Sequence, residues 1–247
     1  SSDEDSDTVT YSKSGTDAGD FNINSTTGVL TFASTPNFEI PTDADENNTY
    51  IVIITATDDG TGTLTDTQTL TITVTDVNEV PTDISLSSSS VNENESSGTT
   101  VGAISSTDVD AGDSHAYALV SGTGSTNNAS FAISGSNLVT NADFNFEVKS
   151  SYAIRVETED SGGLTYEEAF TITIVDVNDA PVITSNGGGA TGSDNFAENA
   201  TSAVTTVTSS DEDSDTVTYS KSGTDAGDFN INSTTGVLTF ASTPNFE

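Results

Sequence analysis

The chain has 247 residues, and its 39 acidic against 4 basic residues give a formal net charge of −35 at pH 7. Binding to phosphate backbones requires Lys and Arg, so this charge excludes nucleic acid as a partner. There is no Cys, so no disulfide can stabilise the fold, and no apolar run is long enough for direct membrane insertion in this segment.

A repeat organises the sequence from end to end. The segment from Ser1 to Glu39 recurs unchanged as Ser209 to Glu247. Two further stretches, residues 76–81 (DVNEVP) and 176–181 (DVNDAP), are near copies of each other. Each follows an alternating run and ends in a Pro, which cannot continue a strand ladder, so we interpret both as linkers. The parent chain is therefore expected to be a tandem array of alternating units.

These linkers divide the chain into three predicted domains. Residues 81–180 make one complete unit, and we expect 1–80 to lack its N-terminal strands and 181–247 to lack its C-terminal strands. The N-terminal strands that the first unit lacks correspond to residues 181–208 of the last unit. Head-to-tail partners completing each other by donated strands is therefore one open hypothesis, and a fragment cut from a longer polymer is the other.

Apolar and polar residues alternate within each unit with the period of a strand, and no run has a helical period. Residues 134–136 (SGS) separate two short apolar runs as in a hairpin. About seven short strands with turn signals every 8–12 residues predict an all-β fold of tandem Greek-key antiparallel β-sandwiches. The predicted strands lie at residues 50–56, 69–75, 101–105, 116–120, 131–133, 137–139, 152–157 and 170–175.

Acidic residues recur at fixed places in these units. Each linker carries an acidic residue, an Asn and a second acidic residue, which are the oxygen donors that a hard cation prefers. In the complete unit the other acidic places are residues 91–94 (VNEN), 108–113 (DVDAGD), 145–147 (NFE) and 158–160 (TED). An isolated acidic turn is most simply a solvated loop, but the recurrence of the whole set points to ion binding.

This set of motifs resembles the cadherin repeat, in the version found in long bacterial surface adhesins, over the whole chain. The linkers look like the family pattern D-x-N-D-N-x-P, shortened by one residue before the Pro. The other motifs look like the family's P-E-N, D-x-D-x-G, D-R-E and A-x-D, in that order. The resemblance implies Ca2+ bound where the bottom of one repeat, the linker and the top of the next converge.

The resemblance implies two sets of ligands. At the first junction they are Glu39, Asn78, Glu79, Asp108, Asp110 and Asp160. At the second junction they are Glu93, Glu147, Asn178, Asp179, Asp211 and Asp213. Glu198 is the matching first-strand acid of the last unit, and Asp3, Asp5 and Asp58 would face a preceding repeat.

Several positions depart from the family pattern. Asn37 and Asn145 replace a carboxylate that serves the outermost ion, so the resemblance implies that this ion binds more weakly or not at all. Glu79 is one methylene longer than the usual Asp. Ala180 and Val80 stand where the family has its second linker Asn and where a backbone carbonyl is expected to suffice.

The predicted function is a calcium-rigidified spacer in an extracellular, cell-surface or secreted fibre or adhesin. Its partners would be neighbouring repeats, with head-to-tail or lateral self-association, the latter through exposed Ile51 and Ile53. The alternative is a carbohydrate- or protein-binding module that mediates adhesion. An enzyme is not expected, because the chain has one His, His115, and no pairing of a nucleophile with a base.

Overall fold

We describe residues 6–247 in a computed structural model. Contacts between Cα atoms divide the chain into two compact units. Unit 1 contains Ser1–Leu86, Ile104–Val120 and Val156–Glu168, and unit 2 contains Ser87–Ala103, Ser121–Arg155 and Ala169–Glu247. Strands β8 (Thr100–Thr107), β12 (Ser151–Glu159) and β13 (Thr165–Val175) run from one unit into the other.

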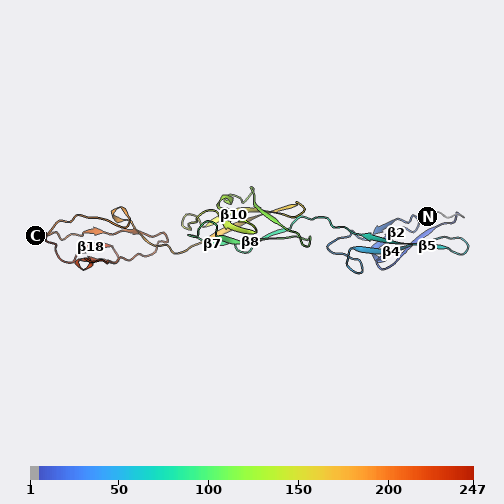
Figure 1. The fold of residues 1–247 in the computed structure, drawn as a ribbon, viewed down its shortest axis with the longest axis horizontal. Helices are drawn as coiled ribbons and strands as arrows, with labels where there is room; N and C mark the ends of the chain where they lie inside the picture. Colours follow the sequence, from blue (N-terminus) through green and yellow to red (C-terminus); the bar gives the residue numbers. More distant parts are fainter. Residues whose placement is uncertain (1–5) are drawn as a thin grey trace. The chain divides into compact units, whose positions relative to one another are not determined.

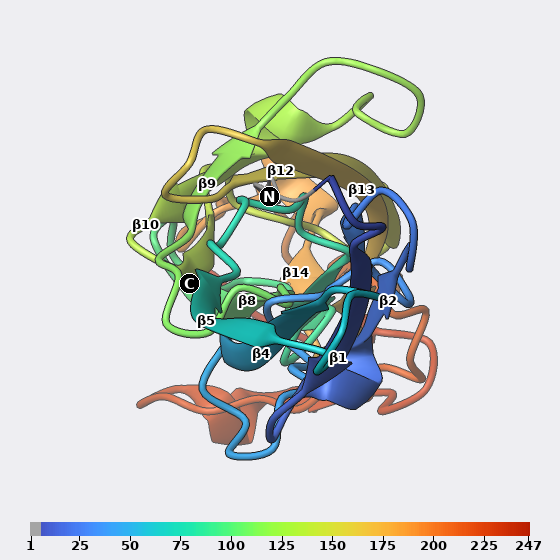
Figure 2. The same ribbon diagram turned by 90° about the vertical axis from the view of Figure 1, so that its right-hand side faces the viewer.

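Unit 1 begins with an antiparallel sheet in the order β1-β4-β5 (Figures 1 and 2). Its strands are β1 (Thr10–Ser14), β4 (Thr49–Thr57) and β5 (Thr65–Thr73). The hairpin of β2 (Phe21–Ile23) and β3 (Leu30–Phe32) follows the 3-10 turn η1 (Ala18–Asp20). Tyr50 and Val52 of β4 are buried whereas Ile51 between them is 43% exposed, since successive side chains of a strand point to opposite faces.

The core of this part of unit 1 is aromatic. Phe21 and Tyr50 are each 1% exposed, and the Phe32 ring lies 4.7 Å from Phe21 and 5.2 Å from Tyr50 between centroids. Asp17, just before η1, ties this turn to β4 and to the loop that precedes β4. Its carboxylate accepts hydrogen bonds from the backbone N–H groups of Ala44 (2.8 Å) and Ile51 (2.7 Å). A buried carboxylate with two backbone donors is well satisfied.

The central part of the chain contains two four-stranded sheets, in the orders β10-β11-β8-β6 and β7-β13-β12-β9. The strands not yet named are β6 (Asp83–Leu86), β7 (Ser90–Asn92), β9 (Ala116–Leu119), β10 (Phe131–Ser134) and β11 (Asn137–Thr140). β7 pairs with β13 in parallel, whereas the other pairings described are antiparallel. Buried residues such as Ile154, Val156, Ile172 and Ile174 alternate along β12 and β13 as the sequence predicts.

Unit 2 ends with short strands. β14 (Val182–Ile183) pairs with β16 (Ser209–Ser210), and the order of the last sheet is β15-β18-β17. Its strands are β15 (Thr205–Thr206), β17 (Phe229–Ile231) and β18 (Val237–Phe240). The remaining 3-10 turns are η2 (Asn128–Ser130), η3 (Ser185–Gly187) and η4 (Ala226–Asp228).

The all-β prediction is confirmed, and residues 6–247 contain no α-helix. The predicted hairpin is β10–β11, whose turn contains Gly135 at φ 60°, a conformation that favours Gly. The strands predicted from the sequence do not include β1, β2, β3, β6, β7 or the strands of residues 181–247, each of which has five residues or fewer and is too short to show a clear period. The three predicted domain boundaries stay a prediction.

Candidate metal centres

Four carboxylates of unit 1 converge after β5. One oxygen from each of Glu39, Asp76, Glu79 and Asp110 lies within 4.8 Å of those of the others. Glu39 lies between β3 and β4, Asp76 and Glu79 come from the linker, and Asp110 comes from the turn between β8 and β9. Three separate segments of the chain therefore bring negative charge to one place.

Hydrogen bonds hold this group but leave oxygens free. The backbone N–H of Glu79 donates to Asp110 Oδ2 at 2.9 Å, and the N–H of Glu39 donates to Asn37 Oδ1 at 2.8 Å. Glu39 Oε1, Glu79 Oε2 and Asp110 Oδ1 are enclosed and have no hydrogen-bond partner. Enclosed carboxylate oxygens without a donor are costly, so this arrangement suits a cation.

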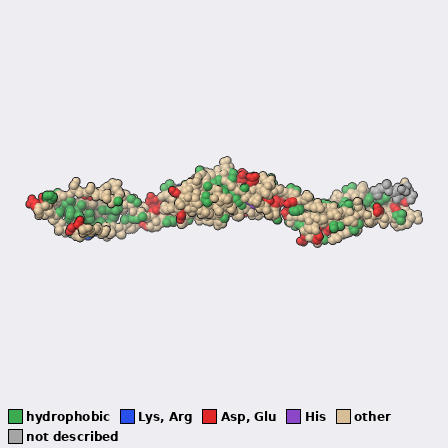
Figure 3. Space-filling view, viewed as in Figure 1, with side chains coloured by type: hydrophobic (Ala, Val, Ile, Leu, Met, Phe, Trp, Pro, Cys, Tyr) green, Lys and Arg blue, Asp and Glu red, His purple; other side chains and the backbone are tan. Residues whose placement is uncertain are grey.

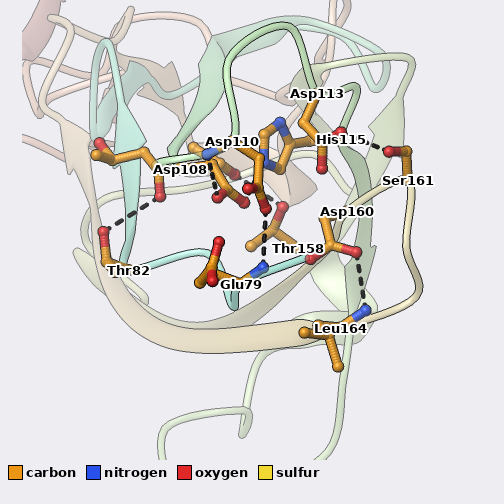
Figure 4. Close-up of polar contacts among 12 residues, drawn as sticks. Glu79, Thr82, Asp108, Asp110, Asp113, His115, Thr158, Asp160, Ser161 and Leu164 are labelled. Carbon is orange, nitrogen blue, oxygen red and sulfur yellow. Dashed lines mark hydrogen bonds and ion pairs between the residues drawn. The ribbon is translucent and has the colours of Figure 1, made fainter. Parts of the chain in front are cut away.

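A second acidic group of unit 1 lies beside the first (Figure 4). It consists of Asp108, Asp113 and Asp160, again with one oxygen each within 4.8 Å of one another. His115 Nε2 lies 3.3 Å from Asp108 Oδ2, and Ser161 Oγ donates to Asp113 Oδ1 at 2.5 Å. Asp113 Oδ2 is enclosed without a partner, as in the first group.

The linker Asn joins this second group. Asn78 Nδ2 donates to Asp160 Oδ2 at 3.0 Å, and the backbone N–H of Leu164 donates to Asp160 Oδ1 at 2.8 Å. A Cβ at residue 162 would lie 2.1 Å from Asn78 Oδ1, so a larger residue in place of Gly162 would displace the Asn78 side chain. Asp160 is only 5% exposed, which places the linker amide against a buried carboxylate.

Unit 2 contains two further groups that share Glu147. One is Glu93, Glu147 and Asp176, and the other is Glu147, Asp179 and Glu212. Glu93 is 1% exposed and accepts hydrogen bonds from the backbone N–H groups of Phe146 (2.7 Å) and Val177 (2.8 Å). These bonds tie the loop after β11 and the linker after β13 to one carboxylate.

The linker also binds the turn after β16. The backbone N–H of Asp179 donates to Asp213 Oδ2 at 2.5 Å, and Asn94 Nδ2 donates to Asp179 Oδ1 at 3.0 Å. Asp179 Oδ2 and Asp213 Oδ1 are enclosed without a partner. Unit 2 thus repeats the feature of unit 1, with carboxylate oxygens held in place but not satisfied.

The charges in these groups oppose one another. Burial raises the pKa of the Glu79 carboxyl, and the neighbouring carboxylates of Asp110 and Glu39 raise that pKa further. Burial and the charge of Asp213 raise the pKa of Asp176. Burial also raises the pKa of Asp179, although the hydrogen bond from Asn94 acts in the opposite direction. Raised carboxyl pKa values mean that the ionised groups lack positive neighbours.

Asp160 behaves differently. Desolvation by burial acts to raise its pKa, but the hydrogen bonds from the backbone of Leu164 and the side chain of Asn78 outweigh this effect and lower the pKa. Asp160 is therefore held in its charged form by donors from the protein itself.

The structure brings together eight of the residues that the resemblance assigned. Glu39, Glu79 and Asp110 lie in the first group of unit 1, and Asp108 and Asp160 lie in the second. Glu93, Glu147 and Asp179 lie in the groups of unit 2. Their role as metal ligands stays a prediction, since proximity alone tests no ion.

Other assigned residues lie next to these groups or outside them. Asn78 and Asp213 contact the groups through the hydrogen bonds given above. Asn178 is exposed and its Nδ2 donates to the backbone oxygen of Asp179 at 3.2 Å. Asp58, Asp211 and Glu198 accept backbone N–H groups from Leu64, Asp215 and Phe246, and none of the three belongs to an acidic group in the described part of the chain. Asp3 and Asp5 lie outside the described residues.

Four carboxylates of the groups were absent from the assigned ligand sets. Asp76 and Asp176 are the first residues of the two linkers, so the acidic linker pattern already contained their signal. Asp113 and Glu212 had only a weak signal, Asp113 as an extra acid after an Asp-x-Asp turn and Glu212 as the middle residue of one. Acidic side chains gather in separate patches in the space-filling view (Figure 3).

Comparison with known proteins bears on the fold. A protocadherin γB4 extracellular domain matches 96% of this chain with 27% sequence identity and a TM-score of 0.60, and the match covers 38% of that chain. The fold is that of cadherin extracellular domains. The EC22–24 region of mouse cadherin-23 matches over 96% of this chain and 77% of its own, with 21% identity and a TM-score of 0.64.

A third match is the EC3–6 region of protocadherin γB7, solved as a cis-dimer. It shares 23% identity over 97% of this chain and 59% of its own, with a TM-score of 0.60. This chain spans less than two thirds of both protocadherin fragments. No protein-family model matches the sequence, and no curated protein does. The described residues contain no helix that is long and apolar enough to span a membrane.

Proposed function

We propose that this chain is a calcium-rigidified spacer of an extracellular fibre or adhesin, with Ca2+ bound by the acidic groups that include the two linkers. The observation that carries the proposal is the set of enclosed carboxylate oxygens without hydrogen-bond partners, from Glu39, Glu79, Asp110, Asp179 and Asp213. These oxygens come from segments far apart in the sequence, and each group includes or touches a linker residue.

The donor set fits calcium. Calcium accepts six to eight oxygen ligands from carboxylates, amides and carbonyls with flexible geometry. The groups consist of carboxylates, and the Asn78 amide donates to Asp160 of one group. The chain has no Cys, and its one His, His115, contacts Asp108. In unit 1 the ion would be held by Glu39, Asp76, Glu79 and Asp110. In unit 2 it would be held by Glu93, Glu147, Asp176 and Asp179.

The chemistry that calcium supplies is positive charge shared by several carboxylates. The protein's own residues position those carboxylates: Asp110 is tied to the linker N–H of Glu79, and Glu93 is tied to the linker N–H of Val177. Without the ion, like charges within 4.8 Å repel one another, and the linker gains freedom. With the ion, binding energy adds to the stability of the ordered linker.

Location and partners follow from the same proposal. The neighbours in fold are extracellular fragments, and one of them was solved as a cis-dimer. We therefore propose an extracellular location, with neighbouring repeats of the same array as the first partners and self-association as the second. A spacer needs no catalytic step, so we propose a non-enzymatic role.

The test is small-angle X-ray scattering and differential scanning calorimetry of the full chain, in millimolar calcium and then in chelator. We expect calcium to raise the melting temperature and to reduce the spread of conformations needed to fit the scattering. The variant Asp110→Asn should weaken calcium binding, whereas Asp66→Asn, an exposed acid on β5, should not. Identical scattering and melting in both solutions would overturn the proposal and favour a carbohydrate- or protein-binding module.

A further inference from the structure

The last part of the chain exposes the apolar face on which its identical copy builds a core. In residues 181–247, all of which the structure describes, no apolar side chain is buried. The rings of Phe229 and Phe240 lie 4.6 Å apart between centroids, but both are only half-buried. An open cavity beside Phe240 is lined in part by Phe196 and Phe246, and apolar side chains gather over this part of the chain (Figure 3). Contiguous exposed apolar surface of this kind marks an interaction site.

The first copy shows which side chain covers this face. The rings of Phe21 and Phe32 lie 4.7 Å apart, as their counterparts do, and Tyr50 of β4 packs edge-on against both. In the central part of the chain, Tyr152 of β12 likewise lies edge-on to Phe131. The last part of the chain has the two Phe rings without such a Tyr, so the side chain that fits there is that of a strand like β4.

The strand pairings lead to the same conclusion. Thr10–Ser14 forms β1 against β4, whereas the identical residues 218–222 form no strand. β7 pairs in parallel with β13, whereas residues 195–197, at the matching positions before a Glu-Asn pair, form no strand. β5, which corresponds to β13, has β4 as its only described neighbour. Both segments that lie outside a sheet therefore have β4 or β5 as the matching strand.

The segment that ends at Glu198 is already held as β7 is held. Glu198 Oε2 accepts the backbone N–H of Phe246 at 3.2 Å, as Glu93 Oε2 accepts that of Phe146 at 2.7 Å. The N–H of Glu93 in turn donates to the backbone oxygen of Val175, at the end of β13, at 3.0 Å. The end of β5 is the place that would supply the same acceptor to Glu198, so this part of the chain is arranged in advance for a strand like β5.

We infer that residues 218–247 of one chain bind β4 and β5 of a second copy, which releases that copy's own residues 10–39. The contacts that β4 makes with residues 10–39 are replaced by identical ones, because the two segments have the same sequence. Residues 195–197 then add a pairing with the open edge of β5. The inference gives the proposed self-association its surface and its partner, and it does not depend on calcium. Such a head-to-tail contact is heterologous and can build an open filament.

The exchange competes with the pairing inside each chain. Residues 10–39 are linked to β4 and therefore have a roughly millimolar effective concentration for it, whereas a second chain loses translational and rotational freedom on binding. The single chain is therefore the expected form in dilute solution, and the exchanged form should accumulate as the protein concentration rises.

The test is sedimentation velocity of the full chain over a concentration series up to roughly millimolar, with calcium and with chelator. Phe229→Ala removes a ring from the accepting face and should weaken association by about tenfold or more. Phe21→Ala makes the same change at the identical position of the first copy. It should strengthen association instead, because it loosens the hold of residues 10–39 on β4.

A chain that stays monomeric throughout the series would overturn the inference, and so would association that the two Phe variants change equally or not at all. The proposed function is tested separately, since the effect of calcium on the melting temperature is measured in dilute solution and does not require association.

A cross-link keeps the test independent of folding defects. Ser12 faces Thr55 across β1 and β4, so the exchange brings Ser220 of one chain opposite Thr55 of another. The chain has no Cys, and facing residues of paired strands lie within reach of a disulfide. Concentrated Ser220→Cys mixed with Thr55→Cys should therefore give a disulfide-linked pair of chains under mild oxidation. Ser220→Cys mixed with Thr71→Cys, on β5 and not adjacent to β1, is the control, and equal yields from the two mixtures would show the inference to be wrong.

Discussion

The same sequence occurs twice in this chain in two different surroundings. The first copy ends at Glu39 and is followed by β4 and β5, whereas the second copy ends the chain at Glu247. Both copies form the same hairpin, with Phe21 opposite Phe32 in the first and Phe229 opposite Phe240 in the second. Local hydrogen bonds also recur, for example from Lys13 and Lys221 to the carbonyls of Ala18 and Ala226, each at 2.6 Å.

The two copies differ in the features that require contact with residues outside the repeated segment. Thr10–Ser14 forms β1 against β4, whereas residues 218–222 form no strand. Phe21 is 1% exposed, but Phe229 is only half-buried. In the second copy Phe240 instead contacts Phe196, with centroids 5.1 Å apart.

The comparison teaches which parts of the fold are local. The hairpin and its 3-10 turn are encoded within the repeated segment, because they form with either set of neighbours. Strand β1 and the burial of Phe21 depend on β4, since an isolated strand leaves its backbone groups unpaired.

The largest expected effect comes from removing the partner that only the first copy has. Tyr50→Ala deletes a ring that packs edge-on against both Phe21 and Phe32, and it should destabilise this part of unit 1 by about 3–5 kcal/mol. Hydrogen exchange should speed up in β1 to β5 and stay unchanged in β17 and β18. Equal acceleration in both hairpins would show that the two copies do not fold independently.

The second effect compares one residue type at two identical positions. Asp17 is 4% exposed and accepts two backbone N–H groups, whereas its copy Asp225 is exposed. Asp17→Ala leaves both donors unsatisfied and should cost about 2–3 kcal/mol, while Asp225→Ala should cost less than about 0.5 kcal/mol.

Hydrogen exchange read by mass spectrometry measures both variants, and each substitution also gives its own copy a distinct peptide mass. Exchange at Ala44 and Ile51 should respond to Asp17→Ala only. A large effect of Asp225→Ala would mean that the second copy has a partner in solution that its surroundings here lack.

The third effect concerns pH and applies to the acidic groups of both units. The pKa values of Glu79, Asp176 and Asp179 are raised in the folded chain above their ordinary values of 4.5 for Glu and 3.8 for Asp. The folded chain therefore binds more protons than the unfolded chain between the ordinary and the raised values, and stability in chelator should fall as the pH rises through that window.

Calcium should reverse this trend, because it binds the ionised carboxylates and protons compete with it. Melting temperatures measured in a series from about pH 4 to about pH 7.5, with calcium and with chelator, check the sign. Asp160 contributes in the opposite sense, since its lowered pKa adds stability that is lost only below its ordinary value of 3.8. A melting temperature in chelator that rises with pH would contradict the expected repulsion.

The sequence predicted those parts of the structure that depend on periodicity and on fixed motifs. Alternation along residues 152–157 and 170–175 located β12 and β13, and the recurring acids located most members of the acidic groups. Strand β7 was missed because Ser90 and Asn92 flank a single apolar residue, and its parallel pairing with β13 is a tertiary property.

The missed carboxylates show a different limit. Asp113 follows an Asp-x-Asp turn and Glu212 is the middle residue of another, and acidic residues are common at such places for reasons of turn geometry alone. Their inclusion depends on distances to Asp108 and Asp160 in one case and to Glu147 and Asp179 in the other. Spacing in the sequence does not determine such distances, because each group draws on two or three separate segments.

The smallest expected effect tests the other edge of the repeated hairpin. β18 pairs with β15, whereas β3 has β2 as its only described neighbour. Val29 is accordingly 57% exposed, and its copy Val237, which pairs with Thr206, is half-buried. Val29→Thr should change stability by less than about 0.5 kcal/mol, and Val237→Thr should cost about 1 kcal/mol because it buries a hydroxyl.

Hydrogen exchange of β2–β3 in the first variant and of β17–β18 in the second gives the two values. Similar costs at both positions would show that residue 29 is also covered in solution, so that a strand equivalent to β15 pairs with β3. The difference between the two valines therefore measures directly whether the edge of β3 is open.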